Sequence, residues 1–200
     1  MKHAATGLGL LFWLAACGGG GGGGGGIDPR LARLDLYEAQ KLRVLGDDGA
    51  GVMGMAATAD ENMPAGGVMT FAGHGAIRIE TGGQPLALLG DAQMQVDFGN
   101  SNASGVIENT FGATTDGKIV DYTGAITMQG TATTQNMPLS YDGTLSAGDQ
   151  TLVFSGAMNG VFRGNPTVAL SAADLEAAVV QNGMPRTATV VVTFEQVPAP

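Results

Sequence analysis

From residue 68 to the C-terminus, apolar and polar residues alternate along most of the chain. In the segment DAQMQVDFG (residues 91–99), every second residue from Ala92 to Phe98 is apolar, and polar residues stand between them. A period of two is typical of a strand with one buried face and one solvated face. Four other segments alternate in the same way, with the apolar faces Tyr122, Ile126 and Met128; Leu139, Tyr141 and Leu145; Leu152, Phe154, Met158 and Phe162; and Ala188, Val190, Val192 and Phe194. We count about seven strands between residues 68 and 197 and expect an eighth from the region 51–58 or from division of a long strand.

Turn-forming sequences separate these segments, namely TGGQ, GNSNASG, TDGK, TQNMP and SAGD, as expected for a meander. The sharpest turn is predicted at Asp116-Gly117, because both residues tolerate the positive φ of a type I′ hairpin. Seven or eight antiparallel strands close most economically into a barrel, because closure removes exposed edges. We therefore predict an all-β fold, a single antiparallel up-and-down β-barrel of about eight strands. A two-sheet sandwich is the alternative.

Two segments depart from the strand pattern and predict helices. In RLARLDLYEAQKLRVLGDDGAG (residues 30–51), leucines and Tyr37 recur at roughly helical spacing before a Gly/Asp stop, which indicates a short N-terminal helix. Its basic residues are expected on a solvated face, with a membrane surface as the alternative contact; they are Arg30, Arg33, Lys41 and Arg43. The segment SAADLEAAVVQNG (residues 171–183) begins with a Ser-x-x-Asp cap and ends in Asn-Gly, so we predict a short helix before the last strand. Residues 52–67 have little periodicity and are expected to form a linker or irregular arm.

The N-terminus has the features of an export signal. A polar start with Lys2 and His3 precedes the apolar run GLGLLFWL, which is too short to span a bilayer. The run ends in LAAC (residues 14–17), which resembles the lipobox of bacterial lipoproteins, and nine glycines follow. The resemblance implies cleavage before Cys17, which then carries the lipid, and the glycines act as a flexible tether. A cleaved signal with an unmodified cysteine is the alternative.

The residue after the cysteine bears on the destination of the protein. Gly18 takes the place of the aspartate that commonly retains such lipoproteins at the inner membrane, so the resemblance implies the outer membrane. The chain then divides into a signal peptide at residues 1–16, a lipidated cysteine and tether at 17–27, a helix and irregular arm at 28–65, and a barrel at 66–200.

Composition narrows the function classes. Hydrophobic residues make up 44% of the chain and charged residues 14%, which is not a disordered composition. The formal net charge is −9, and the basic residues beyond position 49 are few and scattered, so we expect no nucleic-acid partner. Methionines fall on the apolar strand faces, where filling of the core explains them.

Few of the residue types that commonly act in catalysis occur after the predicted signal peptide. Beyond Cys17 there is no cysteine, and His74 is the one histidine after the signal, so thiolate metal sites and the usual catalytic triads cannot be assembled. We expect His74, between two glycines, in a turn or on a strand surface. The carboxylates Asp97, Glu108, Asp121 and Asp142 are expected on solvated faces or near turns. We therefore predict no catalytic residue, no metal and no cofactor, and a protein that is not an enzyme.

Two segments carry a family resemblance. VDFGNSNASGVI (residues 96–107) and GAMNGVFRGNP (residues 156–166) resemble the paired strand signatures of the transferrin-binding protein B type β-barrel. With the lipobox and the Gly-rich tether, they make the chain similar to the surface lipoproteins built on this barrel, including factor H-binding protein and the haemoglobin-haptoglobin utilisation lipoproteins. The resemblance implies the barrel and a non-catalytic binding role. The chain has room for one barrel without a second lobe. The resemblance therefore supports the fold more strongly than it supports transferrin as a partner.

These observations lead to two functional hypotheses. The first is a monomeric lipoprotein of the bacterial outer membrane, anchored through the lipid on Cys17, that binds a host or environmental protein or a solute. The second is a structural lipoprotein that faces the periplasm, and the sequence leaves the orientation of the barrel open. No ligand-binding residue is assigned. Because bulky side chains such as Phe154 are expected to fill the interior, binding is expected through outer loops such as 99–105 and 133–138, or through the N-terminal helix near them, rather than in a lipocalin-like cavity.

Overall fold

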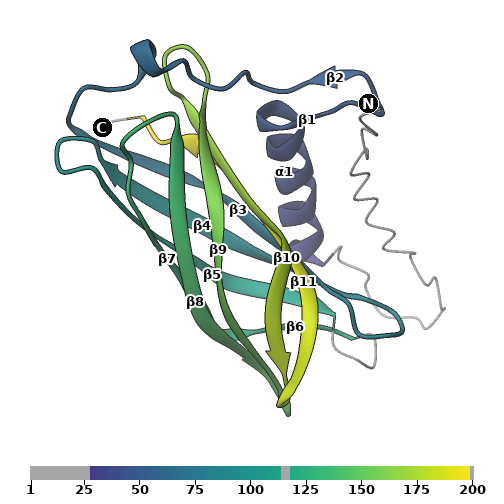
Figure 1. Cartoon of the computed structure of the whole chain (residues 1–200). Coiled ribbons are helices and arrows are strands. Elements are labelled where there is room, and N and C mark those ends of the chain that lie inside the picture. The colour runs from purple at the N-terminus through teal and green to yellow at the C-terminus, as the bar shows by residue number, and fades with distance from the viewer. Residues whose placement is uncertain (1–27, 114–117, 199–200) are drawn as a thin grey trace, which may run out of the picture.

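The structure is a computed structural model that describes residues 28–113 and 118–198 (Figure 1). The predicted signal peptide, Cys17, the glycine tether and the Asp116-Gly117 turn lie outside the described residues. The elements are α1 Pro29–Val44, β1 Gly46–Asp47, β2 Val52–Met53, η1 Asp60–Asn62, β3 Val68–Ile79, β4 Leu86–Asp97, β5 Asn102–Ala113, β6 Ile119–Asp121, β7 Thr123–Gly130, β8 Asn136–Ala147, β9 Gln150–Arg163, β10 Ala169–Gln181 and β11 Met184–Gln196.

Eight long strands, β3, β4, β5 and β7 to β11, form a closed antiparallel barrel. Each pairs with the next long strand along the chain, and β11 pairs with β3, from Ala188 opposite Ile79 to Gln196 opposite Phe71. The short β6 pairs with the end of β5 and leads into β7. The predicted up-and-down barrel is therefore confirmed, and the sandwich alternative is excluded.

The predicted helix at residues 171–183 is wrong, because this segment lies in strand β10. It is the eighth long strand of the barrel, which we had expected from the region 51–58 or from a divided strand. Both edges of β10 are paired, with β9 on one side and β11 on the other. This pairing satisfies the backbone N–H and C=O groups of β10 and outweighs the helix propensity of its Ala, Leu and Glu residues.

A β-bulge in β10 explains why the strand pattern was hidden. The pairing of β10 with β11 shifts its register between Asp174 and Ala177. Before the shift, the inward-facing residues include Leu170 and Ala172, and after it they include Ala177 and Val179. The buried face thus moves from even-numbered to odd-numbered positions, which breaks the period of two.

The interior of the barrel holds the main core. The apolar faces predicted from the sequence all point inward, and side chains from all eight long strands meet in one buried cluster. Glycines make room for large neighbours: a Cβ at Gly105 would lie 2.8 Å from Cε of Met94 on the adjacent strand. Gly156 likewise leaves space for the ring of Tyr141. Bulky and small residues therefore interlock across strands, as in a packed core.

The predicted N-terminal helix is confirmed as α1, which lies on the outside of the barrel over β11 and β3 (Figure 1). Asp28 caps it by accepting a hydrogen bond from the backbone N–H of Arg30 at 3.0 Å, and Pro29 begins the first turn. Tyr37 is 2% exposed and anchors the helix in a second, smaller cluster with Leu34, Ala76, Leu89 and Phe111. Among the described residues, no helix is long and apolar enough to cross a membrane.

The two ends of the barrel differ. One end, the hairpin end, is formed by the turns at 80–85, 148–149 and 182–183 and by the first residues of β6. The other, the arm-capped end, carries the loops 98–101, 131–135 and 164–168. Residues 54–67 run across the arm-capped end with η1 above it (Figure 1). Apart from β1, β2 and η1, residues 45–67 are irregular, which agrees with the prediction for residues 52–67.

Adjacent alanines on β10 test the assignment of this segment. Ala177 is 1% exposed and faces the core, whereas Ala178 faces solvent. We expect Ala177→Asp to lower the free energy of unfolding by about 3 kcal/mol or more, because it buries an unpaired carboxylate. The control Ala178→Asp should change it by less than about 0.5 kcal/mol. Urea denaturation measures both, and equal losses would contradict the assigned faces.

The attachment of α1 can be tested at its anchor. We expect Tyr37→Ala to weaken the docking of α1 by about 3 kcal/mol, because it empties the small cluster beneath the helix. Hydrogen exchange of the amides of residues 29–44 should then speed up, while exchange in the barrel strands stays slow. The neighbouring control is Leu36→Ala, since Leu36 is 61% exposed and its loss should leave exchange unchanged. Unchanged exchange in Tyr37→Ala would show that this side chain does not hold the helix.

Candidate functional site

The residues singled out for possible chemistry lie apart from one another. Among the described residues, no group of three or more His, Asp or Glu side chains is arranged to hold a metal ion. Asp121 and Asp142 are exposed, Glu108 is half-buried on β5, and Asp97 ends β4, where the side-chain amide of Asn100 donates to it at 2.7 Å. These carboxylates therefore lie at strand ends or on the outer wall, as expected. Cys17 lies outside the described residues.

The densest polar cluster on the barrel lies under the first half of α1 and centres on Asp91. Arg33 donates to the carboxylate of Asp91 at 2.8 Å, and the side-chain amide of Asn109 donates to its other oxygen at 3.1 Å. Nδ1 of His74 lies 3.8 Å from the same carboxylate. The guanidinium of Arg33 also lies 4.8 Å from the ring centroid of Phe111.

Local backbone geometry brings this cluster together. A bulge between Leu89 and Asp91 in the pairing of β4 with β5 sets Gly90 opposite two residues of β5. Asn109 is one of them, with a positive φ of 50°, a conformation that Asn tolerates better than most residues. The distortion turns the amide of Asn109 toward Asp91, which a regular strand would not do.

His74 lies on β3 and faces outward, but α1 covers it. The expected strand-surface position is confirmed, although the side chain is only 16% exposed. Burial lowers the pKa of His74 most strongly; the negative charge of Asp91 opposes this effect and the positive charge of Arg33 adds to it. The Nδ1 atom is buried without a hydrogen-bond partner. The cluster therefore favours a neutral His74 that packs beneath the helix, with a T-shaped contact to Tyr37.

A second polar contact fixes the other half of α1. Arg43 donates two hydrogen bonds to Glu195 on β11, at 2.8 and 2.7 Å. These bonds lower the pKa of Glu195, while its partial burial acts the other way. Between the two clusters, the amide of Gln40 donates to the backbone carbonyl of Ala72 at 3.3 Å. Both polar clusters thus attach the helix to the barrel.

The expectation of a solvated basic face on the helix is therefore wrong for Arg33, which is half-buried against the barrel, whereas Arg43 is exposed and also pairs with Glu195. The face of α1 toward the barrel follows Arg33, Tyr37, Gln40 and Val44, at i, i+4, i+7 and i+11; the last three are buried and Arg33 is half-buried. Tyr37 was predicted at helical spacing, whereas the polar Arg33 and Gln40 were not part of the apolar pattern.

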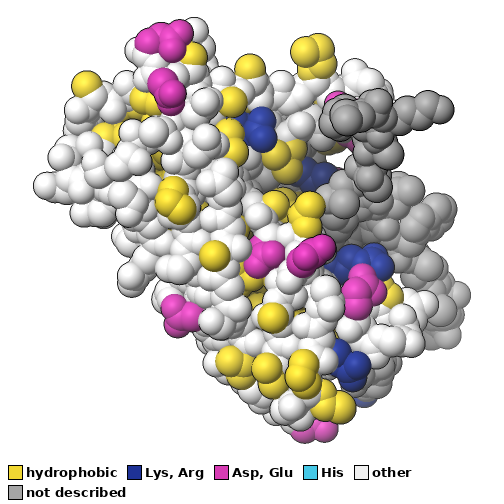
Figure 2. Space-filling model, viewed as in Figure 1, with side chains coloured by type: hydrophobic (Ala, Val, Ile, Leu, Met, Phe, Trp, Pro, Cys, Tyr) yellow, Lys and Arg dark blue, Asp and Glu magenta, His cyan; other side chains and the backbone are white. Residues whose placement is uncertain are grey.

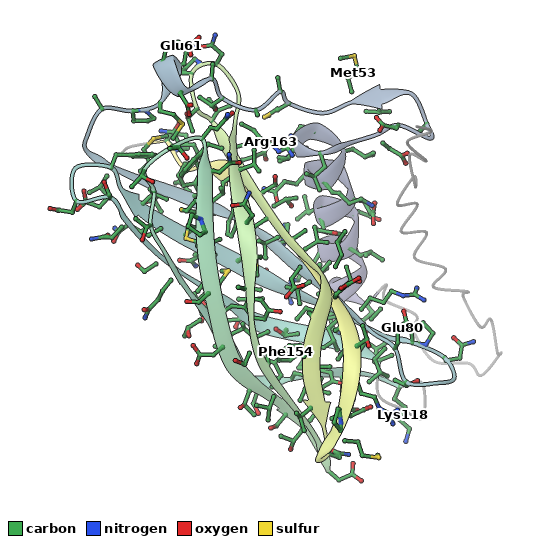
Figure 3. All side chains as sticks on the ribbon, viewed as in Figure 1. Met53, Glu61, Glu80, Lys118, Phe154 and Arg163 are labelled. Carbon is green, nitrogen blue, oxygen red and sulfur yellow. The ribbon has the colours of Figure 1, made fainter. Side chains whose placement is uncertain are left out.

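The arm, residues 54–67, is hydrogen-bonded to the arm-capped end of the barrel. The backbone N–H of Thr58 donates to the carbonyl of Phe162 at 2.9 Å, and that of Gly164 donates to the carbonyl of Ala56 at 2.9 Å. Arg163 adds a hydrogen bond to the carbonyl of Met55 at 2.8 Å. Residues 55–58 thus extend the sheet beside the end of β9 (Figure 3).

Three segments far apart in the sequence form one exposed surface at the arm-capped end. The carboxylate of Asp60 in η1 accepts a hydrogen bond from the backbone N–H of Gln135 at 3.0 Å. Ala132 in the same loop donates to the carbonyl of Ser101 at 3.2 Å. The loops predicted to bind a partner, 99–105 and 133–138, are therefore neighbours. The loop residues outside the strands are 98–101 and 131–135. The arm joins them, whereas α1, which was expected near them, lies over β11 and β3.

The exposed side chains of this surface are mostly short and polar. Glu61, Asn100, Thr133 and Thr134 are exposed, and Figure 3 shows Glu61 at the outer edge of the arm. Apolar side chains also reach solvent at this end: Val168, just before β10, and Val197, just after β11, are exposed, and the backbone N–H of Gln196 donates to the carbonyl of Val168. Such a mixture of short polar groups and small apolar ones offers hydrogen bonds and modest contact area.

Comparison with known proteins supports the fold. No protein-family model matches the sequence, and no curated protein matches it. A similar solved structure is that of a single-site mutant of the vaccine antigen transferrin-binding protein B from Haemophilus parasuis Hp5, with 18% sequence identity and a TM-score of 0.50. The match covers 72% of this chain and 29% of that chain. A double mutant of the same antigen is also similar, with 19% identity, a TM-score of 0.48, and coverage of 72% and 28%.

At this level of identity the likeness establishes the fold alone. The chain corresponds to less than a third of the length of that antigen. The resemblance found in the sequence is therefore confirmed for the barrel: this chain shares a β-barrel fold with part of transferrin-binding protein B.

Proposed function

We propose that this protein is an outer-membrane lipoprotein, acylated at Cys17, whose barrel is a non-catalytic binding module for a protein or solute partner. Residues 1–16 are the signal peptide and residues 17–27 the tether. The observation that carries the proposal is the lipobox LAAC followed by nine glycines, directly ahead of a folded barrel. Two or three acyl chains are sufficient for stable attachment to a bilayer.

The direction of the barrel relative to its tether supports a binding role for the arm-capped end. The tether leads into Asp28 and Pro29, and Arg30 in the first turn of α1 donates to the carbonyl of Ile119, at the start of β6. The chain therefore enters the barrel at the hairpin end. Strands of about 12 residues tilted in a barrel place the arm-capped end roughly 30 Å farther along the axis. That surface would face away from the membrane.

The packed interior argues for binding on the outside. Phe154 and Phe162 are among the largest fully buried side chains, and they belong to the one cluster that joins all eight long strands. An eight-stranded barrel has room for its own side chains or for one small ligand. Since this barrel uses its interior for packing, the exposed loops and the arm supply the surface for a partner.

The similar antigen from Haemophilus parasuis is named for binding transferrin, a protein. A protein partner for this chain is consistent with that use of the fold. Transferrin itself is not part of the proposal, because the match leaves most of that antigen without a counterpart here. Sparse aromatic side chains on the arm-capped end favour a modest affinity.

Acylation can be tested directly. Cys17→Ser should remove the membrane anchor, so the protein should become soluble or remain at its unprocessed size. Fractionation and mass spectrometry of the expressed full chain measure both properties. The matched control is Gly22→Ser in the tether, which should stay in the membrane at the mature size. A Cys17→Ser protein found in the membrane at the mature size would contradict the lipobox.

Display at the cell surface can be tested with a new thiol at the arm-capped end. A chain whose Cys17 carries the lipid has no other thiol, so Glu61→Cys introduces the one site for a maleimide reagent. We expect a membrane-impermeant maleimide to label this variant on intact cells and the unsubstituted protein to remain unlabelled. Labelling only after the outer membrane has been opened would contradict display and favour the structural, periplasm-facing alternative.

A further inference from the structure

A cluster of exposed apolar residues lies near the hairpin end: Val153, Val180 and Pro185 on the outer face of β9, β10 and β11, and Met184 at the rim of the barrel opposite Gln181. Val153 lies opposite Val180 in the register of β9 and β10, and Val180 lies opposite Pro185 in the register of β10 and β11. Met184 is adjacent on β11. Val153, Val180 and Met184 are 43%, 40% and 54% exposed. We name these four residues the apolar tip, and Figure 2 shows hydrophobic side chains gathered at this extremity of the barrel.

None of these residues contributes to the core. The inward-facing residues of the same strands, such as Leu152 and Val179, belong to the buried cluster, whereas Val153, Val180 and Pro185 point the opposite way and Met184 is exposed at the rim. Valine, methionine and proline on the solvent face of a strand end cost solubility and add no packing. Grouped exposed apolar residues of this kind indicate a surface that contacts a partner or a membrane.

The position of the tether identifies the partner. We propose that the apolar tip rests on the phospholipid surface of the membrane to which Cys17 is anchored; this inference rests on the proposed function. Eleven residue steps separate Cys17 from Asp28, so the start of α1 lies typically about 18 Å, and at most about 40 Å, from the lipidated residue. The hairpin end, which receives the tether, is therefore held near the bilayer continuously.

Charge distribution favours the same orientation. The described residues near the hairpin end include Arg30, Arg78, Lys118 and Arg186 as well as Asp28, Glu80, Asp121 and Asp149, so positive and negative side chains balance there. Figure 3 shows Glu80 and Lys118 in this part of the molecule and Glu61 at the arm-capped end. The net charge of the chain is −9, so the excess of negative charge lies elsewhere. An anionic bilayer would repel the rest of the molecule more than this end.

Arg186 adds a specific cationic group beside the apolar tip. It lies two residues after Met184, and its Nε donates to the neutral side-chain amide of Gln181 at 3.2 Å. Among the described residues, no carboxylate forms an ion pair with Arg186, and Asp149 is the acidic residue of the neighbouring β8–β9 turn. Arg186 lies opposite Val179, on the side of β11 that also carries Met184, so its side chain lies at the barrel rim. A guanidinium beside an exposed methionine suits the boundary between phosphate headgroups and acyl chains.

Tryptophan fluorescence can test this contact. The one tryptophan of the chain is Trp13, which lies within the predicted signal peptide, so a mature chain with Val153→Trp or Asn159→Trp would carry a single reporter. Both positions lie on the outer face of β9 and are exposed, about 20 Å apart along the strand. The reporter at 159 also controls for the preference of the indole ring for membrane interfaces.

The lipidated full-length mature proteins are reconstituted in vesicles of phosphatidylethanolamine and phosphatidylglycerol, with and without brominated acyl chains. We expect the Val153→Trp protein to lose fluorescence in brominated vesicles and to shift its emission to shorter wavelength, and the Asn159→Trp protein to do neither. Flotation of both proteins with the vesicles but equal fluorescence in brominated and unbrominated lipid would overturn this inference alone. Failure of both proteins to float would overturn the lipid anchor, and this inference with it.

Discussion

The pairing of β11 with β3 is the contact on which the rest of this structure depends. It joins the last strand of the chain to the first strand of the barrel and converts an open meander into a closed one. Closure leaves no edge of the barrel unpaired and lets all eight strands share one core. Gly73 illustrates how tight the contact is: a Cβ at this position would lie 2.7 Å from Oε1 of Gln40 and would collide with the carbonyl of Thr193.

Helix α1 lies across this closing pair and is bound to both of its strands. Tyr37 packs on Ala76 of β3, and Arg43 pairs with Glu195 of β11. Gln40 lies between them, donating to Ala72 on β3 while Thr193 on β11 donates to its side-chain oxygen at 3.4 Å. The sequence predicts the helix, but its periodicity does not show which strands the helix covers. It covers the one strand pair whose members are far apart in the chain.

Sequence reasoning succeeded where alternation was regular and failed where a local irregularity shifted it. The inward faces of β4, β7, β8, β9 and β11 were all predicted, because each keeps its period of two across the barrel wall. In β10 a bulge moves the buried face by one position at Asp174, and the resulting spacing looks helical. On α1, the face toward the barrel includes Arg33 and Gln40 besides the predicted Tyr37, so a search for apolar residues at helical spacing found only part of it. Contacts such as that between Asp60 and Gln135 join segments about 75 residues apart. The local sequence of either segment has no pattern that predicts such a contact.

In the lipoprotein that we propose, the helix that covers the closing strands would also receive the tether, which would link attachment to stability. Any pull from an anchor at Cys17 would then reach the folded domain at Asp28 and pass along α1 before it reached a strand. The contacts that resist it are distributed along the helix, from the ion pair of Arg33 with Asp91 to that of Arg43 with Glu195. Half-buried ion pairs and a buried tyrosine resist detachment better than isolated surface pairs do. Under this proposal, a glycine tether and a helix fixed at several points would together let the barrel move above the membrane without opening the strand pair that holds it closed.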